Sequence, residues 1–462
     1  MTALTRVHDS HGAGTLPITG GRLRPALALR RNPVEFAEST WREHGDIVRM
    51  VLGPRGADRE MWWLHHPDAA ARVLSGSSWR TYAKRDRVYE EIAYWLGPGL
   101  LAAEGDEWTR QRTMLQPAFT KEAVHGYADL MVEEIEAFIS GWDAGAPVTL
   151  DLSDHMQHLT LQVVLRALFG ESASDAVPHV RRSFPSLSDT IVRRGLGPVA
   201  LPRAIPTRTV RRGRAARADL LAVCDRLITA RREGPETASD LLGRLLTAHD
   251  ANGPLSDDEV RAQVLVFLLA GHETTSTALT FALHLLGQHQ DVQDAVRSEV
   301  RAVLGNSRPT ATTAANLPCT TAALKEAMRL YPSAPMLGRL TLQDDEIIGH
   351  RVTRGTNVVV VPWTIHRHPD LWVDPLVYDP SRFTGDGTRP APAHRYAWMP
   401  FGGGPRACIG QHFSMVEAVL ALALILREHR VTPATTARRP RVSAAITLVP
   451  TEPILATITR IA

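Results

Sequence analysis

A long apolar segment, residues 256–287, sets the scale of the fold that this 462-residue chain can adopt. Its pattern is helical, because Ser256 precedes two aspartates suited to the first turn of a helix and the apolar run QVLVFLLAG follows. A helix of this length measures on the order of 45 Å, so it must cross a whole domain. The polar run HETTSTALT interrupts the apolar stretch, and buried polar side chains need partners.

Helical patterns dominate from about Trp108 to Leu330, and short strand patterns flank them. Alternating apolar residues in IVRMVLGP, MWWLHHP and LTLQDDEIIGHRVTRGTNVVVVPW predict small sheets, and VSAAITLVP and ILATITR predict strands at the end of the chain. No flexible linker or repeat divides these elements. The sequence therefore predicts a mainly α-helical fold with small β-sheets, built as a single large domain over residues 33–462 and preceded by an irregular N-terminal extension, residues 1–32.

Charge and cysteine content exclude several classes of protein. The 52 basic residues nearly balance 49 acidic ones, so the net charge of +3 gives no special attraction to nucleic acid. The arginine-rich segment 207–217 could be a partner-docking or nucleic-acid patch, but we interpret it as a solvated loop. Three scattered cysteines form no disulfide framework, and the N-terminus has neither an export signal nor a membrane span. We expect an unanchored cytoplasmic protein.

The run FGGGPRACIG, residues 401–410, places Cys408 after a glycine-rich turn and directly before an apolar helix. Glycines let the backbone approach a flat ligand closely, and the helix aims its first N–H groups near the sulfur. Both features favour a thiolate with a lowered pKa, and a soft thiolate is a good ligand for iron. A buried structural cysteine behind a glycine turn is the alternative.

Five residues of this run decide between the two readings, because together they resemble the haem-binding signature of the cytochrome P450 family, Phe-x-x-Gly-x-Arg-x-Cys-x-Gly. The matching residues are Phe401, Gly404, Arg406, Cys408 and Gly410. The resemblance implies that Cys408 is the thiolate ligand of a haem b iron. It also implies a P450-type fold in which the haem lies between the long distal helix and the helix that follows the cysteine loop.

Glu326 and Arg329 lie three residues apart in LKEAMRLYP, on one face of a predicted helix, and could form an ion pair. A solvated surface pair is the common outcome of this spacing. The pair is similar to the Glu-x-x-Arg motif of the P450 family, and Arg382 in DPSRF stands where the family has a third partner. The resemblance implies that these three residues brace the core around the haem.

Residues 270–275, AGHETT, interrupt the apolar run of the long helix. A helix kink with threonine hydroxyls bonded to carbonyls one turn back is the structural interpretation. The resemblance implies that Ala270 and Gly271 lie over the distal face of the haem. It further implies that Glu273 and Thr274 are an acid and an alcohol that relay protons during dioxygen activation. His272 is interpreted as structural or pocket-lining.

Haem propionates need cationic partners. Trp108 and Arg112 in EWTRQR match a Trp-x-x-x-Arg pattern of the family, and the resemblance assigns them to one propionate. Arg339 and Arg406 are the other candidate propionate ligands. For any single arginine in so arginine-rich a chain, a surface role is the alternative.

Family topology places the substrate above the distal haem face, among largely apolar segments. The residues expected there are Phe267, Met336, Leu337 and Ile446. Such a lining suits a hydrophobic molecule, for example a terpenoid, polyketide or fatty-acyl compound, although apolar lining is common to most ligand sites. AGHETTS and QPAF are similar to the branch of the family that includes bacterial fatty-acid hydroxylases.

The resemblance implies a monooxygenase of bacterial secondary metabolism that uses dioxygen and two electrons to hydroxylate or otherwise oxidise its substrate. The electrons would originate from NAD(P)H and arrive through a separate ferredoxin and ferredoxin reductase, and the enzyme is expected to be a monomer. A peroxide-driven peroxygenase or an isomerase is the alternative, which the acid and alcohol pair disfavours. A non-catalytic haem sensor or carrier should lack that pair.

Overall fold

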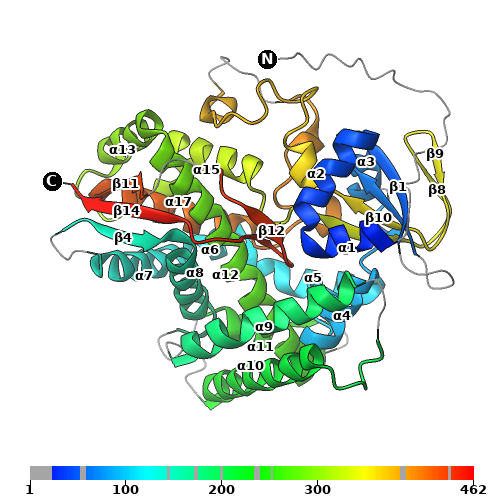
Figure 1. Ribbon diagram of the computed structural model, residues 1–462. Coiled ribbons are helices and arrows are strands. Elements are labelled where there is room, and N and C mark those ends of the chain that lie inside the picture. Colours follow the sequence, from blue (N-terminus) through cyan, green and yellow to red (C-terminus); the bar gives the residue numbers. More distant parts are fainter. Residues whose placement is uncertain are drawn as a thin grey trace.

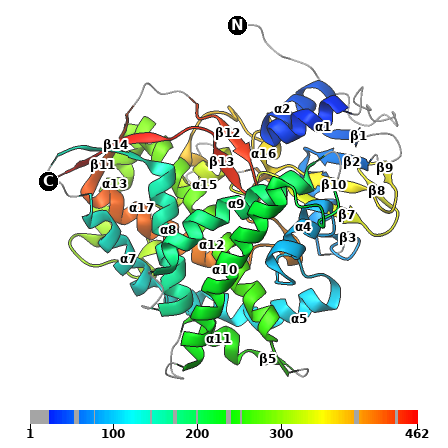
Figure 2. The same ribbon diagram turned by 60° about the horizontal axis from the view of Figure 1, so that its bottom comes forward.

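Helix α12 (Asp257–Gln288) runs through the middle of the molecule, with other helices packed around it (Figure 1). The computed structural model describes residues 23–52, 59–76, 78–142, 146–170, 175–197, 201–233, 240–250, 253–385, 392–434 and 439–461. In Figure 2 the helices between residues 177 and 233 lie across α12, and a smaller sheet region lies to one side. The long helix therefore organises the fold, as its length in the sequence predicts.

The start of α12 is fixed by a capping box. The Ser256 hydroxyl accepts a hydrogen bond from the Glu259 backbone N–H, and the Glu259 carboxylate accepts one from the Ser256 N–H at 2.7 Å. Within the described ranges, α12 is the one helix whose length and hydropathy would allow it to cross a membrane. Its most apolar window is 72% buried inside the protein, so α12 is a core helix.

The remaining helices precede and follow α12 with short connections. Before it come α1 (Leu23–Arg31), α2 (Pro33–His44), α3 (Pro67–Leu74), α4 (Arg87–Leu96), α5 (Gly105–Leu115), α6 (Lys121–His125), α7 (Ala128–Ser140), α8 (Leu152–Phe169), α9 (Val177–Gly195), α10 (Arg208–Glu233) and α11 (Leu241–Thr247). After it come α13 (Gln290–Leu304), α14 (Ala311–Ala315), α15 (Pro318–Leu330), α16 (Pro362–Ile365) and α17 (Gln411–Glu428). Helices α8, α15 and α17 pack directly against α12 and form with it the main hydrophobic core.

Small sheets flank this helical body. The largest has the order β1-β2-β10-β7-β3, from β1 (Ile47–Leu52), β2 (Arg59–Leu64), β10 (Asn357–Val360), β7 (Leu337–Thr341) and β3 (Tyr82–Ala83). A second joins β11 (His429–Pro433), β14 (Leu455–Arg460) and β4 (Val148–Asp151). The pairs are β5 (His249–Asp250) with β6 (Gly253–Pro254), β8 (Asp345–Ile347) with β9 (His350–Val352), and β12 (Val442–Ala444) with β13 (Leu448–Pro450). The predicted fold class, mainly helical with small sheets in a P450-type domain, is confirmed.

The expectation of an irregular stretch over residues 1–32 is wrong for its second part. Helix α1 occupies Leu23–Arg31, whereas residues 1–22 lie outside the described residues. Pro25 stands in the first turn, where a proline removes no helical hydrogen bond. Ala26 and Leu29 are buried on one face, and this packing outweighs the proline and glycine content that suggested an irregular chain.

The expectation of a solvated loop at residues 207–217 is also wrong, because Arg208 begins helix α10. Val210, Gly213 and Ala216 recur at helical spacing and are buried. A Cβ added at Gly213 would lie 2.7 Å from a methyl carbon of Thr190, so the glycine permits the close approach of α9 and α10. The segment is an amphipathic helix, and its high arginine content made the spacing of its buried residues hard to recognise in the sequence.

Candidate active site

The loop that carries Cys408 is closed by its own backbone. The Cys408 N–H donates a hydrogen bond to the Phe401 carbonyl at 2.9 Å, and the Ala407 N–H donates to the Gly404 carbonyl at 3.0 Å. Gly404 has a φ of +65°, and a Cβ there would lie 1.8 Å from the Leu74 carbonyl oxygen. The position therefore requires glycine for two reasons. Gly410 then caps the start of α17.

The electrostatics of Cys408 correct one expectation. Its side chain is accessible, yet protein surrounds it closely enough that burial raises the pKa of the thiol above its ordinary value. The Gly410 backbone N–H, Arg112 and Lys84 act in the opposite direction without overcoming burial. The expected lowering of the Cys408 pKa is therefore wrong for the protein alone. A metal cation at the sulfur would supply the missing stabilisation of the thiolate.

Cations gather beside this loop. Arg112 donates to the Ala407 carbonyl at 2.9 Å, next to the cysteine. The guanidinium of Arg406 stacks on Trp108, 4.2 Å from the ring centroid, donates to the Ala103 carbonyl at 2.8 Å and pairs with Glu104. Burial lowers the pKa of Arg406 to about 10, which Glu104 opposes. The predicted group of Trp108, Arg112 and Arg406 is thus brought together around the cysteine loop.

Arg339 joins the same cluster together with a lysine that the sequence did not single out. Burial, followed by repulsion from Arg339 and Arg406, holds the pKa of Lys84 well below its usual range. Strand β3 pairs with β7 in a register that opposes Ala83 and Leu340, which carries Lys84 toward Arg339. Tyr89 lies within reach of Arg339 as well. The signal that could have identified Lys84 is this long-range pairing of a two-residue strand.

These cations provide a test of whether the site suits a haem. Enclosed positive charges are costly unless an anion compensates them, and Glu104 is the carboxylate that pairs with Arg406. Together with Glu104, a dianionic, flat group with two carboxylates would balance Arg112, Arg339 and Arg406, and the charge of Arg112 also acts on the sulfur of Cys408. The donor set therefore fits a haem with its propionates toward the arginines.

On the other side, α12 presents its polar run. The Thr274 hydroxyl donates to the Ala270 carbonyl at 2.6 Å, which is the bond one turn back that the structural interpretation expects. Ala270 is exposed although α12 is a core helix. A Cβ added at Gly271 would lie 2.8 Å from Val164, so this glycine permits the close packing of α8 on α12. Contact of Ala270 and Gly271 with haem stays a prediction.

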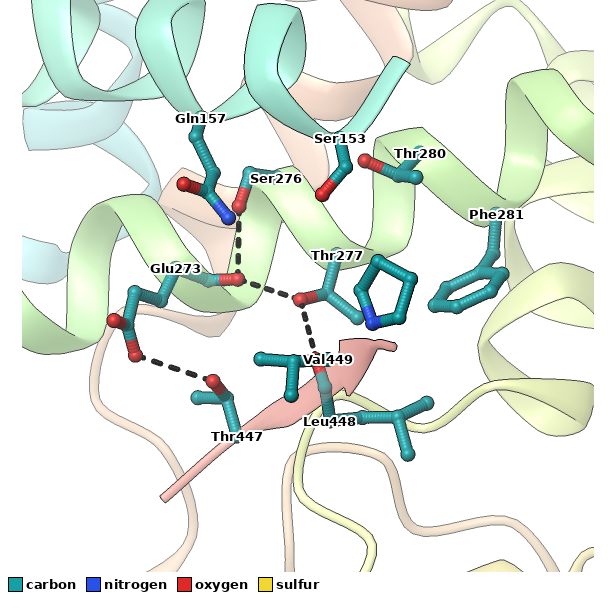
Figure 3. Close-up of a pocket in the computed structure, with 11 residues that line it drawn as sticks. Ser153, Gln157, Glu273, Ser276, Thr277, Thr280, Phe281, Thr447, Leu448 and Val449 are labelled. Atoms are coloured by element: carbon teal, nitrogen blue, oxygen red, sulfur yellow. Dashed lines mark hydrogen bonds between the residues drawn. The ribbon is translucent and has the colours of Figure 1, made fainter. Parts of the chain in front are cut away.

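The carboxyl of Glu273 and the hydroxyl of Thr274 have different hydrogen-bond partners. The Glu273 carboxyl accepts a hydrogen bond from the Thr447 hydroxyl at 3.1 Å, at the turn between β12 and β13 (Figure 3). Burial raises the pKa of Glu273 to about 7, and the bond from Thr447 opposes this shift. A carboxyl with this pKa exchanges protons readily near neutral pH. The structure therefore gives Glu273 a property suited to acid–base work, in an orientation that leaves Thr274 with a different partner.

Glu273 lines a small cavity of mixed polar and apolar lining between α8, α12 and the β12–β13 hairpin (Figure 3). Hydroxyl and amide side chains make up much of its wall. The lining residues are Ser153, Gln157, Glu273, Ser276, Thr277, Thr280, Phe281, Thr447, Leu448, Val449 and Pro450. The cavity has a volume of about 20 Å³ for the centre of a water molecule, enough to hold one. Sequence reasoning missed this cavity because its walls come from distant segments.

His272 is buried and packs against Phe184, with ring centroids 5.6 Å apart. Its Nδ1 contacts the Leu268 carbonyl, and its own carbonyl accepts a hydrogen bond from Thr160 at 3.0 Å. Burial lowers the pKa of His272 to about 4, so the ring is neutral near pH 7. These contacts agree with the structural role expected of it.

The predicted ion pair of Glu326 and Arg329 is present and is fully buried, with both side chains 0% exposed. The two groups form a bidentate contact at 2.6 and 2.7 Å, and Arg382 adds a third contact at 3.2 Å. Arg329 also donates to the carbonyls of His366 and Pro375 at 2.7 Å. The solvated surface alternative is excluded. The triad links α15 to the irregular segment that leads to the cysteine loop.

The four expected substrate residues come from three segments near Thr274. Phe267 lies on α12 and contacts Phe119 edge to face, with ring centroids 5.4 Å apart. Met336, Leu337 and Ile446 are partly buried against the core. The segment before Met336 reaches α12 through Ser333, whose hydroxyl donates to the Thr274 carbonyl at 2.7 Å. Their contact with a substrate stays a prediction.

Comparison with known proteins agrees with this geometry. The cytochrome P450 family model matches residues 15–457. Cyclooctatin synthase of Streptomyces melanosporofaciens is 35% identical over 442 residues, which cover 95% of this chain and 93% of that protein. Cyclooctat-9-en-7-ol 5-monooxygenase of the same organism is 34% identical, with 91% and 90% covered. Pentalenene oxygenase of Streptomyces avermitilis is 31% identical, with the same coverage.

A solved structure extends the agreement to the fold. The crystal structure of the cytochrome P450DA haem domain superimposes with a TM-score of 0.81 at 28% sequence identity and covers 94% of each chain. The family model, the relatives and the solved structure each match this chain over nearly its whole length. The matched length includes the cysteine loop, the buried Glu326 triad and the polar run of α12. The chain belongs to the cytochrome P450 family of haem-iron monooxygenases.

Proposed function

We propose that this monooxygenase oxidises a terpenoid hydrocarbon or alcohol in bacterial secondary metabolism. The support comes from relatives at 31 to 35% identity whose names refer to cyclooctatin and pentalenene, and which act on terpenoids. The apolar side chains of Phe267, Met336, Leu337 and Ile446 suit such a molecule. The terpenoid class is favoured over the polyketide and fatty-acyl classes on the basis of these relatives.

The protein holds the haem through residues on both sides of the cysteine loop. Cys408 is the iron ligand, Arg112, Arg339 and Arg406 neutralise the propionates, and Trp108 supports Arg406 by stacking. When bound, the haem supplies dioxygen activation with two electrons. The observation that carries the proposed haem chemistry is the cluster of these cations around Cys408. Helix α12, with the titratable Glu273 carboxyl, lies on the other side of the site.

Glu273 and Thr274 relay protons in this proposal. Glu273 with a pKa of about 7 is able both to gain and to lose a proton at neutral pH. The Thr274 hydroxyl donates to the Ala270 carbonyl and retains lone pairs that accept a further hydrogen bond. Rotation of the Glu273 side chain, or a water molecule, would connect the two groups.

Electrons originate from NAD(P)H and are delivered by a separate ferredoxin and its reductase. The enzyme acts as a cytoplasmic monomer. Turnover by peroxide alone at the rate seen with ferredoxin and reductase would instead favour the peroxygenase alternative. That comparison separates the two reaction types with one enzyme preparation.

The substrate class is tested by titrating the haem-loaded enzyme with pentalenene, cyclooctat-9-en-7-ol and dodecanoic acid. We expect a terpenoid to displace the water on the iron, seen as a shift of the Soret band, and to be converted to a product heavier by one oxygen atom. The oxygen should derive from labelled dioxygen. Response to dodecanoic acid alone would contradict the terpenoid assignment and leave the monooxygenase assignment intact.

A further inference from the structure

Two segments that carry expected substrate residues also contact α12 at its polar run. Ser333 precedes Met336 and Leu337 and donates its hydroxyl hydrogen bond to the Thr274 carbonyl at 2.7 Å. Thr447 follows Ile446 and donates to the Glu273 carboxyl at 3.1 Å. Each segment therefore contacts one member of the acid and alcohol pair.

The two segments are also joined to each other. The Leu448 N–H donates to the Ser333 carbonyl at 2.9 Å, and the Leu448 carbonyl accepts a hydrogen bond from Thr277 of α12 at 3.1 Å. Figure 3 shows Thr277, on α12, reaching toward the backbone of Leu448, and Thr447 reaching toward the Glu273 carboxyl. The β12–β13 hairpin, the Ser333 segment and α12 thus form one hydrogen-bonded unit.

The hairpin is short enough to transmit a displacement. Ala444 pairs with Leu448, which leaves Ala445, Ile446 and Thr447 as the turn, and the Ala445 N–H donates to the Thr447 carbonyl at 2.9 Å. Because Ile446 and Thr447 are consecutive residues of this turn, a ligand that displaces Ile446 should also displace Thr447. Thr447 is only 4% exposed, so its hydroxyl is shielded from bulk water.

We propose that Thr447 and Ser333 are positioning residues that couple occupation of the substrate site to the proton relay. Thr447 holds the Glu273 carboxyl toward the cavity, and displacement of the hairpin by a ligand changes that hydrogen bond. Ser333 fixes the backbone of Thr274 from the second substrate segment. This inference rests on the proposed role of Glu273 and Thr274 and adds residues to it.

The cavity supports this assignment. Glu273 and Thr447 both line it, and the Ser276 hydroxyl donates to the Glu273 carbonyl at 3.0 Å. The Thr277 hydroxyl shares its one proton between the Glu273 carbonyl at 2.8 Å and the Leu448 carbonyl at 3.1 Å. The backbone of Glu273 is therefore fixed while its carboxyl depends on Thr447 for orientation. A water molecule in the cavity could exchange a proton with the carboxyl in this orientation and not in one turned toward Thr274.

The test uses infrared spectroscopy of the haem-loaded enzyme at pH 6, where a carboxyl with a pKa of about 7 is mainly protonated. Glu273→Gln identifies the C=O stretch of the Glu273 carboxyl by removing it. The probe is 4-phenylimidazole, whose imidazole nitrogen binds haem iron and whose ring fills the space above it. We expect the probe to shift the Glu273 band in the unsubstituted enzyme.

Thr447→Val should move the band to higher wavenumber before the probe is added and abolish the probe-induced shift, whereas Thr447→Ser should restore both. The matched control is Thr451→Val, because the exposed Thr451 hydroxyl contacts only the Arg441 carbonyl among the described partners. For the second segment, Ser333→Ala should reduce the probe-induced shift and Ser298→Ala, at an exposed site on α13, should not.

An unchanged probe response in Thr447→Val, or an equal loss in Thr451→Val, would overturn the assignment of Thr447. An unchanged response in Ser333→Ala would remove Ser333 from the coupling. Failure of the probe to bind the haem-loaded enzyme would instead contradict the substrate site that the proposed function assumes, so that the two failures are distinguishable. None of these readouts depends on turnover or on identification of the natural substrate.

Discussion

The two sides of the candidate site are built differently. On the cysteine side, the backbone of the loop is closed by hydrogen bonds, and Glu326 is paired at 0% exposure with Arg329 and Arg382. On the α12 side, the Glu273 carboxyl has one side-chain hydrogen bond to the part of the chain that the structure describes, and it borders a cavity. The first arrangement leaves groups little freedom, whereas the second leaves a titratable carboxyl able to change partner. The cysteine side therefore acts as a rigid support, and the α12 side holds the group that can move.

Removing a partner from the Glu326 triad should have the largest effect. Glu326→Gln leaves two buried guanidinium groups without a counter-charge, and we expect a loss of about 3–5 kcal/mol in the free energy of unfolding. Denaturant unfolding measures this, with Glu346→Gln on the exposed part of β8 as the control. If Glu326→Gln lowered the free energy of unfolding no more than the control does, the buried triad would not contribute to stability as its contacts indicate.

Thr274→Ala should have the next largest effect. Because Thr274 lies on the α12 side, the substitution should lower the rate of product formation and leave the stability of the fold largely unchanged. Loss of the hydroxyl should lower product formation on the order of 10²-fold, the lower end for a group that transfers protons. Electrons from NAD(P)H should then appear as hydrogen peroxide. Unchanged coupling of electron consumption to product would remove Thr274 from the relay, and Thr274→Ser should retain most of the activity.

Gly404→Ala tests the cysteine loop itself. The substitution forces an alanine to a φ of +65° and places its Cβ 1.8 Å from the Leu74 carbonyl oxygen. Gly349→Ala is matched in backbone conformation, with a φ of +75°, but has nothing within 4 Å of the added carbon. We expect the control to lose about 1–2 kcal/mol from strain alone and Gly404→Ala to lose more, together with haem affinity. Equal losses of stability in the two variants would mean that the cysteine loop shifts to make room for the added carbon.

Glu273 should give the most gradual effect, a dependence of stability on pH that is spread over several pH units. Its pKa is raised from 4.5 to about 7 in the folded protein, so between these values the folded state holds a proton that the unfolded state lacks. Its contribution to stability is therefore greatest below pH 4.5 and falls as the pH rises to 7, by at most about 1.4 kcal/mol per pH unit. Glu273→Gln should flatten this part of the profile, and an unchanged profile would contradict the raised pKa.

Local sequence signals predicted the elements that depend on local chemistry. Ser256, the aspartates at 257 and 258 and the apolar run behind them predicted α12. The spacing of Glu326 and Arg329 allowed an ion pair, and the resemblance to the family motif implied that it lies in the core. The haem-binding loop was recognisable because five residue types stand at fixed spacing within ten residues.

Features that depend on distant segments could not be predicted. Lys84 reaches Arg339 only through the pairing of β3 with β7, and Thr447 reaches Glu273 only through the packing of a C-terminal hairpin on α12. The pKa of Cys408 was misjudged because the charges near it were visible in the sequence, whereas the burial that opposes them was not. Helix α1 was missed because tertiary packing outweighed local composition.

The central claim, that Cys408 is the thiolate ligand of a haem, is tested most directly by the absorption spectrum of the reduced enzyme with carbon monoxide. A thiolate ligand predicts the strongly red-shifted Soret band of the P450 family in the unsubstituted enzyme and its absence in Cys408→Ser. A band of the histidine-ligated type in folded, unsubstituted enzyme, or a red-shifted band that persists in Cys408→Ser, would contradict the assignment.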